Sequence, residues 1–266
     1  MRWNKAGVPR LRWSIRAGPD EEPMKSALRG YPRLPEGLRI YALSDIHGCA
    51  DLLERAFDRI DSDVAHHRVA RVSLVFLGDY VDRGLDTCRT LDILLDRTRD
   101  RPSVFLKGNH EEVLLGFLQD PTLLQDWQQF GGLQTLISYG LKPSLNPSGA
   151  EIYDLARGFA AALPPVHRQF LERLVPSFTC GDYFFAHAGV RPGVPLDQQA
   201  EQDLLWIRDE FLTSQRNFGK FVVHGHTPVK EPDLRTHRLN IDTGAYATGR
   251  LTLLRLQGTD ISFLYI

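Results

Sequence analysis

Short apolar runs that alternate with helical patterns constrain the fold of this chain more than any other feature. Between residues 38 and 118 the sequence predicts strands over 38–43, 72–77 and 104–106, and helices over 50–64, 86–98 and 111–118. Strands that alternate with helices at this spacing indicate an α/β sheet. Each strand is followed by a short block of polar residues and glycine, and α/β proteins build their sites in such loops.

The rest of the chain divides into a helical stretch and a second β-rich part. Residues 121–175 are less regular and rich in aromatic residues, so we expect a helical cap (roughly 119–175) inserted between two halves of the sheet. After Pro176 the pattern predicts strands over 183–186, 221–223, 238–241, 251–256 and 261–265, and one helix over 203–212. The last two strands suggest an antiparallel hairpin across Gly258-Thr259-Asp260.

The first 36 residues differ from the rest of the chain. Five basic residues precede the first acidic one, and several glycines and prolines follow: the basic residues are Arg2, Lys5, Arg10, Arg12 and Arg16. We predict a basic N-terminal arm or linker over 1–36 and one catalytic domain over 37–266. The arm is either a poorly ordered tail or a docking segment for an acidic partner or a membrane surface.

The composition limits the possible partners and compartments. Hydrophobic residues make up 42% of 266 residues, enough for a buried core, and the net charge of −1 argues against nucleic-acid binding. The three cysteines, Cys49, Cys88 and Cys180, fit neither a disulfide framework nor a zinc site, and they favour a cytoplasmic protein. No apolar run is long enough to span a membrane, so we expect no membrane insertion.

The polar blocks at the strand ends contain residue types that bind divalent metals. Carboxylate, imidazole and amide groups suit Mn²⁺, Fe and Zn²⁺, and the candidate ligands are Asp45, His47, Asp79, Asn109, His187 and His226. Two ions about 3.5–4 Å apart can clamp a phosphoryl group and ionise a bridging water. The sequence therefore predicts a site for two divalent ions, with Mn²⁺ favoured over Fe or Zn²⁺, and Asp79 as the bridging carboxylate.

Each of these residues taken alone has a simpler explanation. A lone aspartate after a strand usually caps a turn, and a lone buried histidine is usually a core residue. Several such blocks in order, each after a strand, make that explanation weak. His224 either supports the ligand His226, which we favour, or is itself a ligand. We expect the remaining histidines at the surface: His66, His67, His167 and His237.

Further residues in these blocks are suited to catalysis and phosphate binding. His110 adjoins Asn109, and a carboxylate such as Asp82 would orient its imidazole and raise its pKa. A protonated His110 could donate a proton to a leaving alkoxide. Arg83 can bind phosphate oxygens in a bidentate manner, and Arg208 is a second candidate, although an arginine on an amphipathic helix is normally solvated.

Together the blocks resemble the signature of the PPP family of metallophosphatases, whose pattern is GDxHG, GDxVDRG, GNHE, a later HGG or HAG, and a final histidine. The resemblance covers about residues 38–256 and implies a calcineurin-like metallophosphoesterase fold, a mixed β-sandwich flanked by helices. The matching segments are Ser44-Asp45-Ile46-His47-Gly48, Gly78-Asp79-Tyr80-Val81-Asp82-Arg83-Gly84, Gly108-Asn109-His110-Glu111, His187-Ala188-Gly189 and His224-Gly225-His226-Thr227.

The resemblance also implies a role for each matching residue. One ion would bind Asp45, His47 and Asp79, and the other would bind Asp79, Asn109, His187 and His226. His110 and Asp82 would form the acid pair, and Arg83 and Arg208 would hold the phosphate. A metal-bridging hydroxide would attack phosphorus in line, without a phosphoenzyme.

The expected function is a serine/threonine protein phosphatase acting on a phosphoprotein substrate. The alternative is a symmetrical diadenosine tetraphosphate hydrolase, with aromatic residues of the cap as adenosine walls, or another small-molecule phosphoesterase. A non-catalytic scaffold would normally lack a ligand or the acid, and this chain has them all. Two departures are notable: Ser44 replaces a glycine, and Asp242-Thr243-Gly244-Ala245-Tyr246 stands where eukaryotic members have SAPNY.

Overall fold

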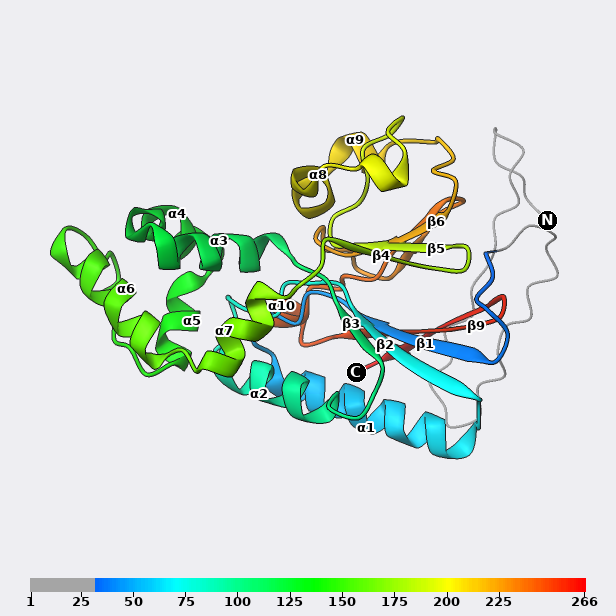
Figure 1. Cartoon of the computed structure of the whole chain (residues 1–266), viewed down its shortest axis with the longest axis horizontal. Helices are drawn as coiled ribbons and strands as arrows, with labels where there is room; N and C mark the ends of the chain where they lie inside the picture. The colour runs from blue at the N-terminus through cyan, green and yellow to red at the C-terminus, as the bar shows by residue number, and fades with distance from the viewer. Residues whose placement is uncertain (1–31) are drawn as a thin grey trace.

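The computed structural model describes residues 32–266, which fold around two five-stranded sheets (Figure 1). The first sheet has the strand order β10-β9-β1-β2-β3. Its strands β1, β2 and β3 are parallel, and β9 and β10 add an antiparallel hairpin beside β1. The strands span Leu38–Leu43 (β1), Arg71–Phe76 (β2), Ser103–Phe105 (β3), Thr252–Gln257 (β9) and Asp260–Tyr265 (β10).

The second sheet has the strand order β4-β5-β6-β8-β7. Its three inner strands β5, β6 and β8 are parallel, and both edge strands are antiparallel to their neighbours. The strands span Ser177–Cys180 (β4), Tyr183–Ala186 (β5), Phe221–His224 (β6), Asp233–Leu234 (β7) and Arg238–Asn240 (β8). Because both sheets contain parallel and antiparallel pairs, the predicted mixed β-sandwich is confirmed.

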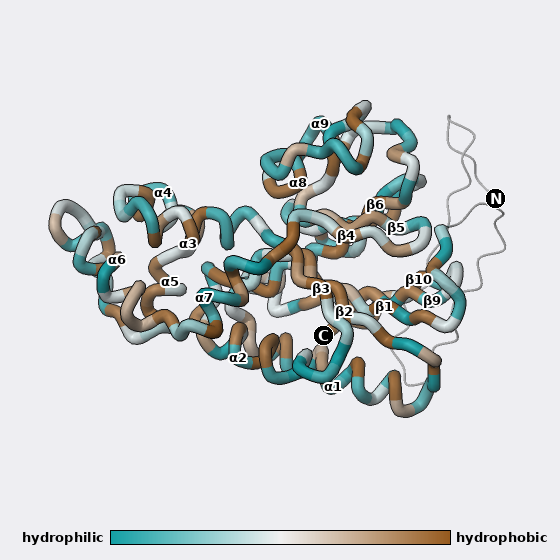
Figure 2. The backbone as a smooth tube through the Cα atoms, viewed as in Figure 1, coloured by the Kyte–Doolittle hydropathy of each residue, from teal (hydrophilic) through white to brown (hydrophobic). Residues whose placement is uncertain are grey.

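Two faces of the first sheet are covered by different partners. Alternate residues of β1 point to opposite sides, so Ile40 packs against the second sheet while Tyr41 packs against the helices. The helices on that outer side are α1 (Ala50–His66) and α2 (Thr87–Arg97), and each buries the apolar positions that recur at helical spacing. In Figure 2 the turns of α1 accordingly alternate between hydrophobic and hydrophilic colouring.

Two short helices cover the outer face of the second sheet. They are α8 (Glu201–Trp206) and α9 (Asp209–Leu212), and Leu204 and Phe211 pack there against Phe184 and Val222. The molecule thus has four layers, helix, sheet, sheet and helix.

The remaining helices form a lobe beyond one end of the sheets (Figure 1). The lobe is inserted between β3 and β4, as predicted for the cap, and its aromatic residues mostly pack inside it. It contains α3 (Asn109–Gln119), α4 (Leu124–Trp127), α5 (Gly132–Ser138), α6 (Ala150–Ala162), α7 (Pro165–Glu172) and the 3-10 turns Pro121–Leu123 and Gln128–Phe130. A further 3-10 turn covers Leu196–Gln198, and α10 covers Ala245–Thr248.

Several predicted elements differ from those in the structure. The single helix expected over 203–212 is two helices, because the chain turns sharply at Arg208 (φ −131°, ψ −104°). Strand β4 and the short β7 were not predicted, since each has few residues and no clear alternation. The prediction that His167 lies at the surface is wrong: it is fully buried, and its ring contacts Tyr139 Oη at 2.9 Å and Asp92 Oδ1 at 3.0 Å.

The predicted basic arm lies largely outside the described residues, which begin at Pro32. Its last residues contact the domain: Leu34 is buried between the sheets, and the backbone N–H of Arg33 donates to Asp182 Oδ2. Within residues 32–266, no helix combines the length and apolarity that crossing a bilayer requires.

Candidate metal centre

Most of the predicted site residues line one pocket at the ends of the strands, beside the helical lobe. The other two, Asp82 and His187, do not line it, but they contact His110 and Asn109, which do. Asp45 and His47 follow β1, Asp79 follows β2, and His226 follows β6. The pocket is lined by Asp45, His47, Asp79, Arg83, Asn109, His110, Phe130, Trp206, Arg208, His226, Pro228, Asp242 and Tyr246. Residues up to 181 positions apart in sequence therefore lie within hydrogen-bond distance of each other.

The backbone is strained where these side chains are presented. Among the described residues, the non-glycine positions with positive φ are all candidate site residues, namely Asp45, His47, Asp79, Asp82, Arg83 and His226. Such conformations are uncommon for residues with a Cβ atom and cost about 1–3 kcal/mol each. Their concentration in one pocket indicates that the fold holds these side chains in place at some expense in stability.

Two glycines allow the backbone to approach the candidate ligands closely. A Cβ atom on Gly108 would lie 2.1 Å from Asp79 Oδ1, and one on Gly225 would lie 2.1 Å from Asp45 Oδ2. Both positions therefore exclude any side chain. The glycines in the GNHE and HGH segments thus have a steric reason that involves the carboxylates directly.

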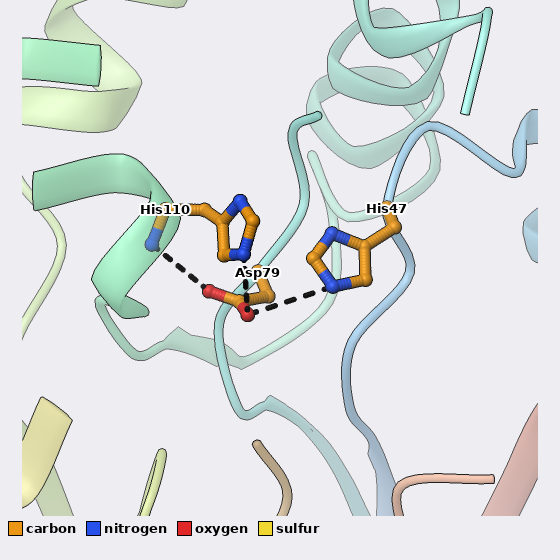
Figure 3. Close-up of side chains that lie close together, drawn as sticks. All are labelled: His47, Asp79 and His110. Atoms are coloured by element: carbon orange, nitrogen blue, oxygen red, sulfur yellow. Dashed lines mark hydrogen bonds and ion pairs between the residues drawn. The ribbon is translucent and has the colours of Figure 1, made fainter. Parts of the chain in front are cut away.

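The Asp79 carboxylate lies between the imidazoles of His47 and His110 (Figure 3). Its Oδ2 atom is 3.6 Å from His47 Nε2 and 3.8 Å from His110 Nε2. Its other oxygen, Oδ1, is 3.4 Å from His187 Nε2. The carboxylate thus presents one oxygen to each of two groups of nitrogen atoms, which is the arrangement that a bridging ligand requires.

A second group of donor atoms gathers on the Oδ1 side of Asp79. His187 Nε2 lies 3.0 Å from Asn109 Oδ1 and 3.1 Å from His226 Nδ1, and the latter two atoms are 2.9 Å apart. Ligands bound to one ion at about 2.0–2.2 Å are themselves separated by about 3 Å. The spacing of these atoms, together with the Asp79 oxygen, fits a divalent ion.

Backbone carbonyls fix the orientation of two imidazoles. His47 Nδ1 lies 2.8 Å from Val81 O, and His187 Nδ1 lies 2.9 Å from Leu77 O. Since a carbonyl only accepts, each Nδ1 carries the proton and each Nε2 presents its lone pair to Asp79. Metal-binding histidines are commonly held in this way.

The charges of the pocket also favour bound cations. The pKa of Asp45 is raised well above its usual value by burial and, to a smaller extent, by the charge of Asp242. The pKa of Asp79 is likewise raised by burial and then by the charge of Asp45. Burial lowers the pKa of His187 to about 3, so its imidazole stays neutral. Crowded carboxylates and neutral imidazoles are stabilised by divalent ions, so the donor set fits metal binding.

Asp45 occupies a different position from the other candidate ligands. Both its carboxylate oxygens accept from the backbone N–H of His226 at 3.1 Å, and it lines the same pocket. The close group around Asp79 Oδ2 consists instead of His47 and His110. His224 is buried outside both groups, with its Nδ1 3.1 Å from Gly225 O and its Nε2 3.4 Å from Arg238 Nη1.

His110 and Asp82 form a buried pair next to the candidate metal ligands. His110 Nδ1 lies 2.7 Å from Asp82 Oδ2, and both side chains are almost fully buried. The expected increase in the imidazole pKa is not found, because burial and then the charge of Arg83 lower the pKa of His110 to about 3. A bound phosphate would oppose this effect, since a nearby anion favours the imidazolium form.

Two arginines line the pocket, and each is held by a side-chain hydroxyl. Arg83 Nη1 donates to Tyr246 Oη at 2.6 Å, and its Nη2 lies 3.4 Å from His110 Nε2. Arg208 Nη1 donates to Thr227 Oγ1 at 3.3 Å. The break between α8 and α9 brings Arg208 to the pocket, so its position depends on a bend that the sequence did not predict.

The aromatic residues at the pocket were largely missed by sequence reasoning. Trp206 lines the pocket, and its Nε1 donates to Glu112 Oε2 at 2.6 Å, whereas the sequence placed it in an ordinary amphipathic helix. Phe130 is an aromatic residue of the lobe that lines the pocket, and its ring centroid lies 6.2 Å from that of Trp206. Cys49 contacts the backbone of His47. Burial raises the pKa of its thiol to about 11, which does not suit a nucleophile.

Comparison with known proteins places the chain among metallophosphoesterases. Two curated relatives are named bis(5'-nucleosyl)-tetraphosphatase PrpE [asymmetrical]. The Oceanobacillus iheyensis protein is 24% identical over 82% of this chain and 88% of its own length, and the Bacillus cereus (strain ATCC 10987) protein is 28% identical over 80% and 88%.

Solved structures share the fold. A provisionally assigned diadenosine tetraphosphatase superposes with a TM-score of 0.56 at 20% identity, covering 85% of this chain and 93% of its own. A cold-active protein tyrosine phosphatase superposes with a TM-score of 0.51 at 17% identity, covering 87% and 81%. Residues 38–257 match the calcineurin-like phosphoesterase family, and this chain belongs to that family.

Proposed function

We propose that this protein is a metal-dependent hydrolase of dinucleoside tetraphosphates that cleaves its substrate asymmetrically. The observation that carries the proposal is the similarity to curated relatives of that name along about four fifths of this chain. The relatives favour a dinucleoside tetraphosphate over a phosphoprotein as the substrate. They also favour asymmetrical over symmetrical cleavage.

The pocket is small, and two arginines are among the residues that line it. Its cavity of about 40 Å³ has room for about three waters, or a group of that size. A phosphoryl group would enter between Arg83 and Arg208, and the rest of the substrate would lie at the mouth. Tyr246, which is 42% exposed, offers an aromatic face there. Phe130 and Trp206 offer further aromatic walls beside the pocket.

We assign the metal ligands as the sequence predicts. Asp79, Asn109, His187 and His226 would hold one ion, and Asp79, with His47 and Asp45, would hold the other. Bound divalent ions would polarise the phosphoryl oxygens and lower the pKa of a bound water. The chain itself supplies the orientation: Asp79 shares its two oxygens between the groups, and the carbonyls of Val81 and Leu77 fix the imidazoles.

A serine/threonine protein phosphatase remains the second candidate, and the His110–Asp82 pair favours it. Serine and threonine alkoxides are strong bases, so their departure depends on a proton donor. A nucleotide leaving from an anhydride bond is a much weaker base and needs less assistance. A buried acid pair next to the metal ligands is therefore of most use with a phosphate monoester.

Hydrolysis by the purified protein with added Mn²⁺ tests the two candidates. Diadenosine tetraphosphate is compared with phosphoserine, phosphothreonine and phosphotyrosine peptides at equal concentration, and nucleotide products are separated by chromatography. We expect the dinucleotide to be preferred and to give ATP and AMP. ADP as the sole product, two per molecule of substrate, would show symmetrical cleavage and contradict the asymmetrical part of the proposal. A preference for phosphopeptides would overturn the proposal in favour of the second candidate. Asp79→Asn serves as the inactive control.

A further inference from the structure

The Asp82 carboxylate is held by two residues of the helical lobe. Trp127 Nε1, at the end of α4, donates to Asp82 Oδ2 at 2.8 Å, and Thr135 Oγ1, in α5, donates to Asp82 Oδ1 at 2.7 Å. The oxygen that accepts from Trp127 also contacts His110 Nδ1 at 2.7 Å. Both carboxylate oxygens therefore have directional partners, and the plane of the carboxylate is fixed.

The Thr135 hydroxyl uses its whole hydrogen-bonding capacity for this purpose. A hydroxyl can donate once and accept twice. Thr135 Oγ1 donates to Asp82 Oδ1, accepts from the backbone N–H of Asp82 at 2.9 Å, and lies 3.1 Å from Thr87 Oγ1, which is left as the donor. The Thr135 hydroxyl thus binds both the side chain and the backbone of Asp82, and Asp82 has a positive φ of 68°.

The indole of Trp127 is placed against Asp82 by its packing. Trp127 is fully buried and packs on Phe117, with ring centroids 4.9 Å apart. A Cβ atom on Gly132 would lie 2.3 Å from the indole, so the ring rests on a glycine. The adjoining Gly131 accepts from the backbone N–H of Arg83 at 3.2 Å. The segment 127–135 therefore supports both Asp82 and the backbone of the neighbouring arginine.

We propose that Trp127 and Thr135 are positioning residues for the acid pair, which orient His110 by fixing the Asp82 carboxylate. The inference rests on the proposed phosphoesterase activity and on proton donation by His110. Because a carboxylate only accepts, His110 Nδ1 carries the proton toward Asp82, and Nε2 faces the pocket. Without the two lobe donors, the carboxylate could rotate, and the imidazole would lose its fixed orientation.

The electrostatics agree with this geometry. Burial raises the pKa of the Asp82 carboxyl to about 7, and the hydrogen bonds from Thr135 and Trp127 act against that increase. The two donors therefore favour the charged carboxylate over the neutral acid. A neutral Asp82 would be a poorer partner for the Nδ1–H of His110, since charge-assisted hydrogen bonds are the stronger kind.

The test compares variants that remove the donors to Asp82: Thr135→Val keeps the volume but removes all three hydrogen bonds of the hydroxyl, and Trp127→Phe removes the indole N–H and leaves a smaller ring. Thr135→Ser restores the hydroxyl. Thr90→Val is the matched control, because Thr90 is also a fully buried threonine, and its Oγ1 has no hydrogen-bond partner among the described residues. Phenyl phosphate, which has a poor leaving group, is compared with p-nitrophenyl phosphate, which needs little proton donation.

We expect Thr135→Val and Trp127→Phe to lower kcat with phenyl phosphate by about tenfold or more, with a much smaller loss with p-nitrophenyl phosphate. Thr135→Ser and Thr90→Val should behave like the wild type. Equal losses with both substrates would show a general structural role and overturn the inference.

A spectroscopic measurement separates this inference from the proposed function. The Nδ1–H proton of His110 should give a downfield proton resonance in the free protein, assigned by its absence in His110→Asn. We expect this resonance to shift or broaden in Thr135→Val and Trp127→Phe and to return in Thr135→Ser. An unchanged resonance would refute the positioning role. This holds whatever the substrate proves to be, and a protein inactive on every phosphate ester would contradict only the proposed function.

Discussion

The backbone N–H of Asp79 donates a 2.9 Å hydrogen bond to Glu111 Oε2. The GNHE segment thus holds the segment Gly78–Gly84 in place. The Glu111 carboxylate is fully buried and also accepts from the backbone N–H groups of Gly108, Tyr80 and Val81. Four main-chain donors thus converge on one side chain at the start of α3. This contact fixes the loop after β2, from which the central carboxylate of the site projects.

Glu111→Gln should destabilise the fold. An amide has one acceptor oxygen, and its NH₂ group would face two backbone N–H donors that then lack a partner. We expect a loss of about 3 kcal/mol in the free energy of unfolding, measured by urea denaturation. The adjacent Glu112→Gln is the control, because its partner Trp206 Nε1 can still donate to the amide oxygen. Equal stability of the two variants would contradict this account.

His110→Asn should reduce turnover without removing the metals. The substitution removes the proton donor, which typically contributes about 10²–10⁴-fold to the rate. We expect kcat with phenyl phosphate, whose leaving group is poor, to fall within that range, and kcat with diadenosine tetraphosphate to fall less. Mn²⁺ binding measured by calorimetry should keep the stoichiometry of the wild type. A loss of bound metal in this variant would instead assign His110, which lies 3.8 Å from Asp79 Oδ2, to the ligand set.

Removal of divalent ions should abolish activity and lower thermal stability. Chelation would leave buried carboxylates close together, with Asp45 raising the pKa of Asp79. At a free metal concentration of about 100 times Kd, binding stabilises the folded state by about 2.7 kcal/mol. We expect Mn²⁺ to raise the Tm of the chelator-treated protein and to restore hydrolysis. Asp79→Asn should show neither response, and a normal response in that variant would exclude Asp79 as a ligand.

Asp63→Asn should remove a pH-dependent part of the stability, far from the metal ligands. Asp63 on α1 forms ion pairs with Arg39 at 3.0 Å and with Arg255 at 2.7 Å, and it also accepts from Tyr41 Oη. Burial alone raises its pKa, but the Tyr41 hydrogen bond and the two arginines outweigh burial and hold the pKa below the usual value. Because Arg39 is only 3% exposed, loss of its partner should cost about 3 kcal/mol near pH 7.

The sign of the pH effect follows from the lowered pKa of Asp63. Between the folded and unfolded values the unfolded chain binds more protons, so stability rises with pH there. The contribution of Asp63 is complete above the unfolded pKa of about 3.9 and is lost as the pH falls through the folded pKa. Urea denaturation of both proteins should therefore give a difference that is constant above about pH 5 and shrinks in acid. A constant difference down to pH 2 would contradict the assignment.

Much of the fold and the site could be predicted from local patterns. The strand β1 was predicted with its observed bounds, and the bounds of α1 and α2 differ by no more than two residues, because their apolar positions repeat at strand or helix spacing. His110 and Asp82 were also predicted to be partners, and they lie 2.7 Å apart. The strand and helix bounds depend on residues that are close in sequence. The pairing of His110 and Asp82, which are 28 positions apart, was predicted instead from two short motifs.

Other features depend on contacts between distant segments. Local patterns gave no sign that Trp206 lines the pocket, that Thr135 holds Asp82 or that His167 is buried. The lowered pKa of His110 likewise follows from burial by the surrounding elements and not from its sequence neighbours. A local pattern shows which face of an element is apolar, but it does not show which distant side chain meets that face.

The sequence by itself determined which candidate donors are present and that they follow predicted strands, because residue type and periodicity are local properties. Only the tertiary structure decided which donors lie near each oxygen of Asp79. Asn109 and His226, for example, are 117 positions apart and meet through the packing of the two sheets. The tertiary structure also decided that Trp127 and Thr135 of the helical lobe hold Asp82. Such contacts arise from close packing of whole elements, which fixes distances that no short stretch of sequence contains.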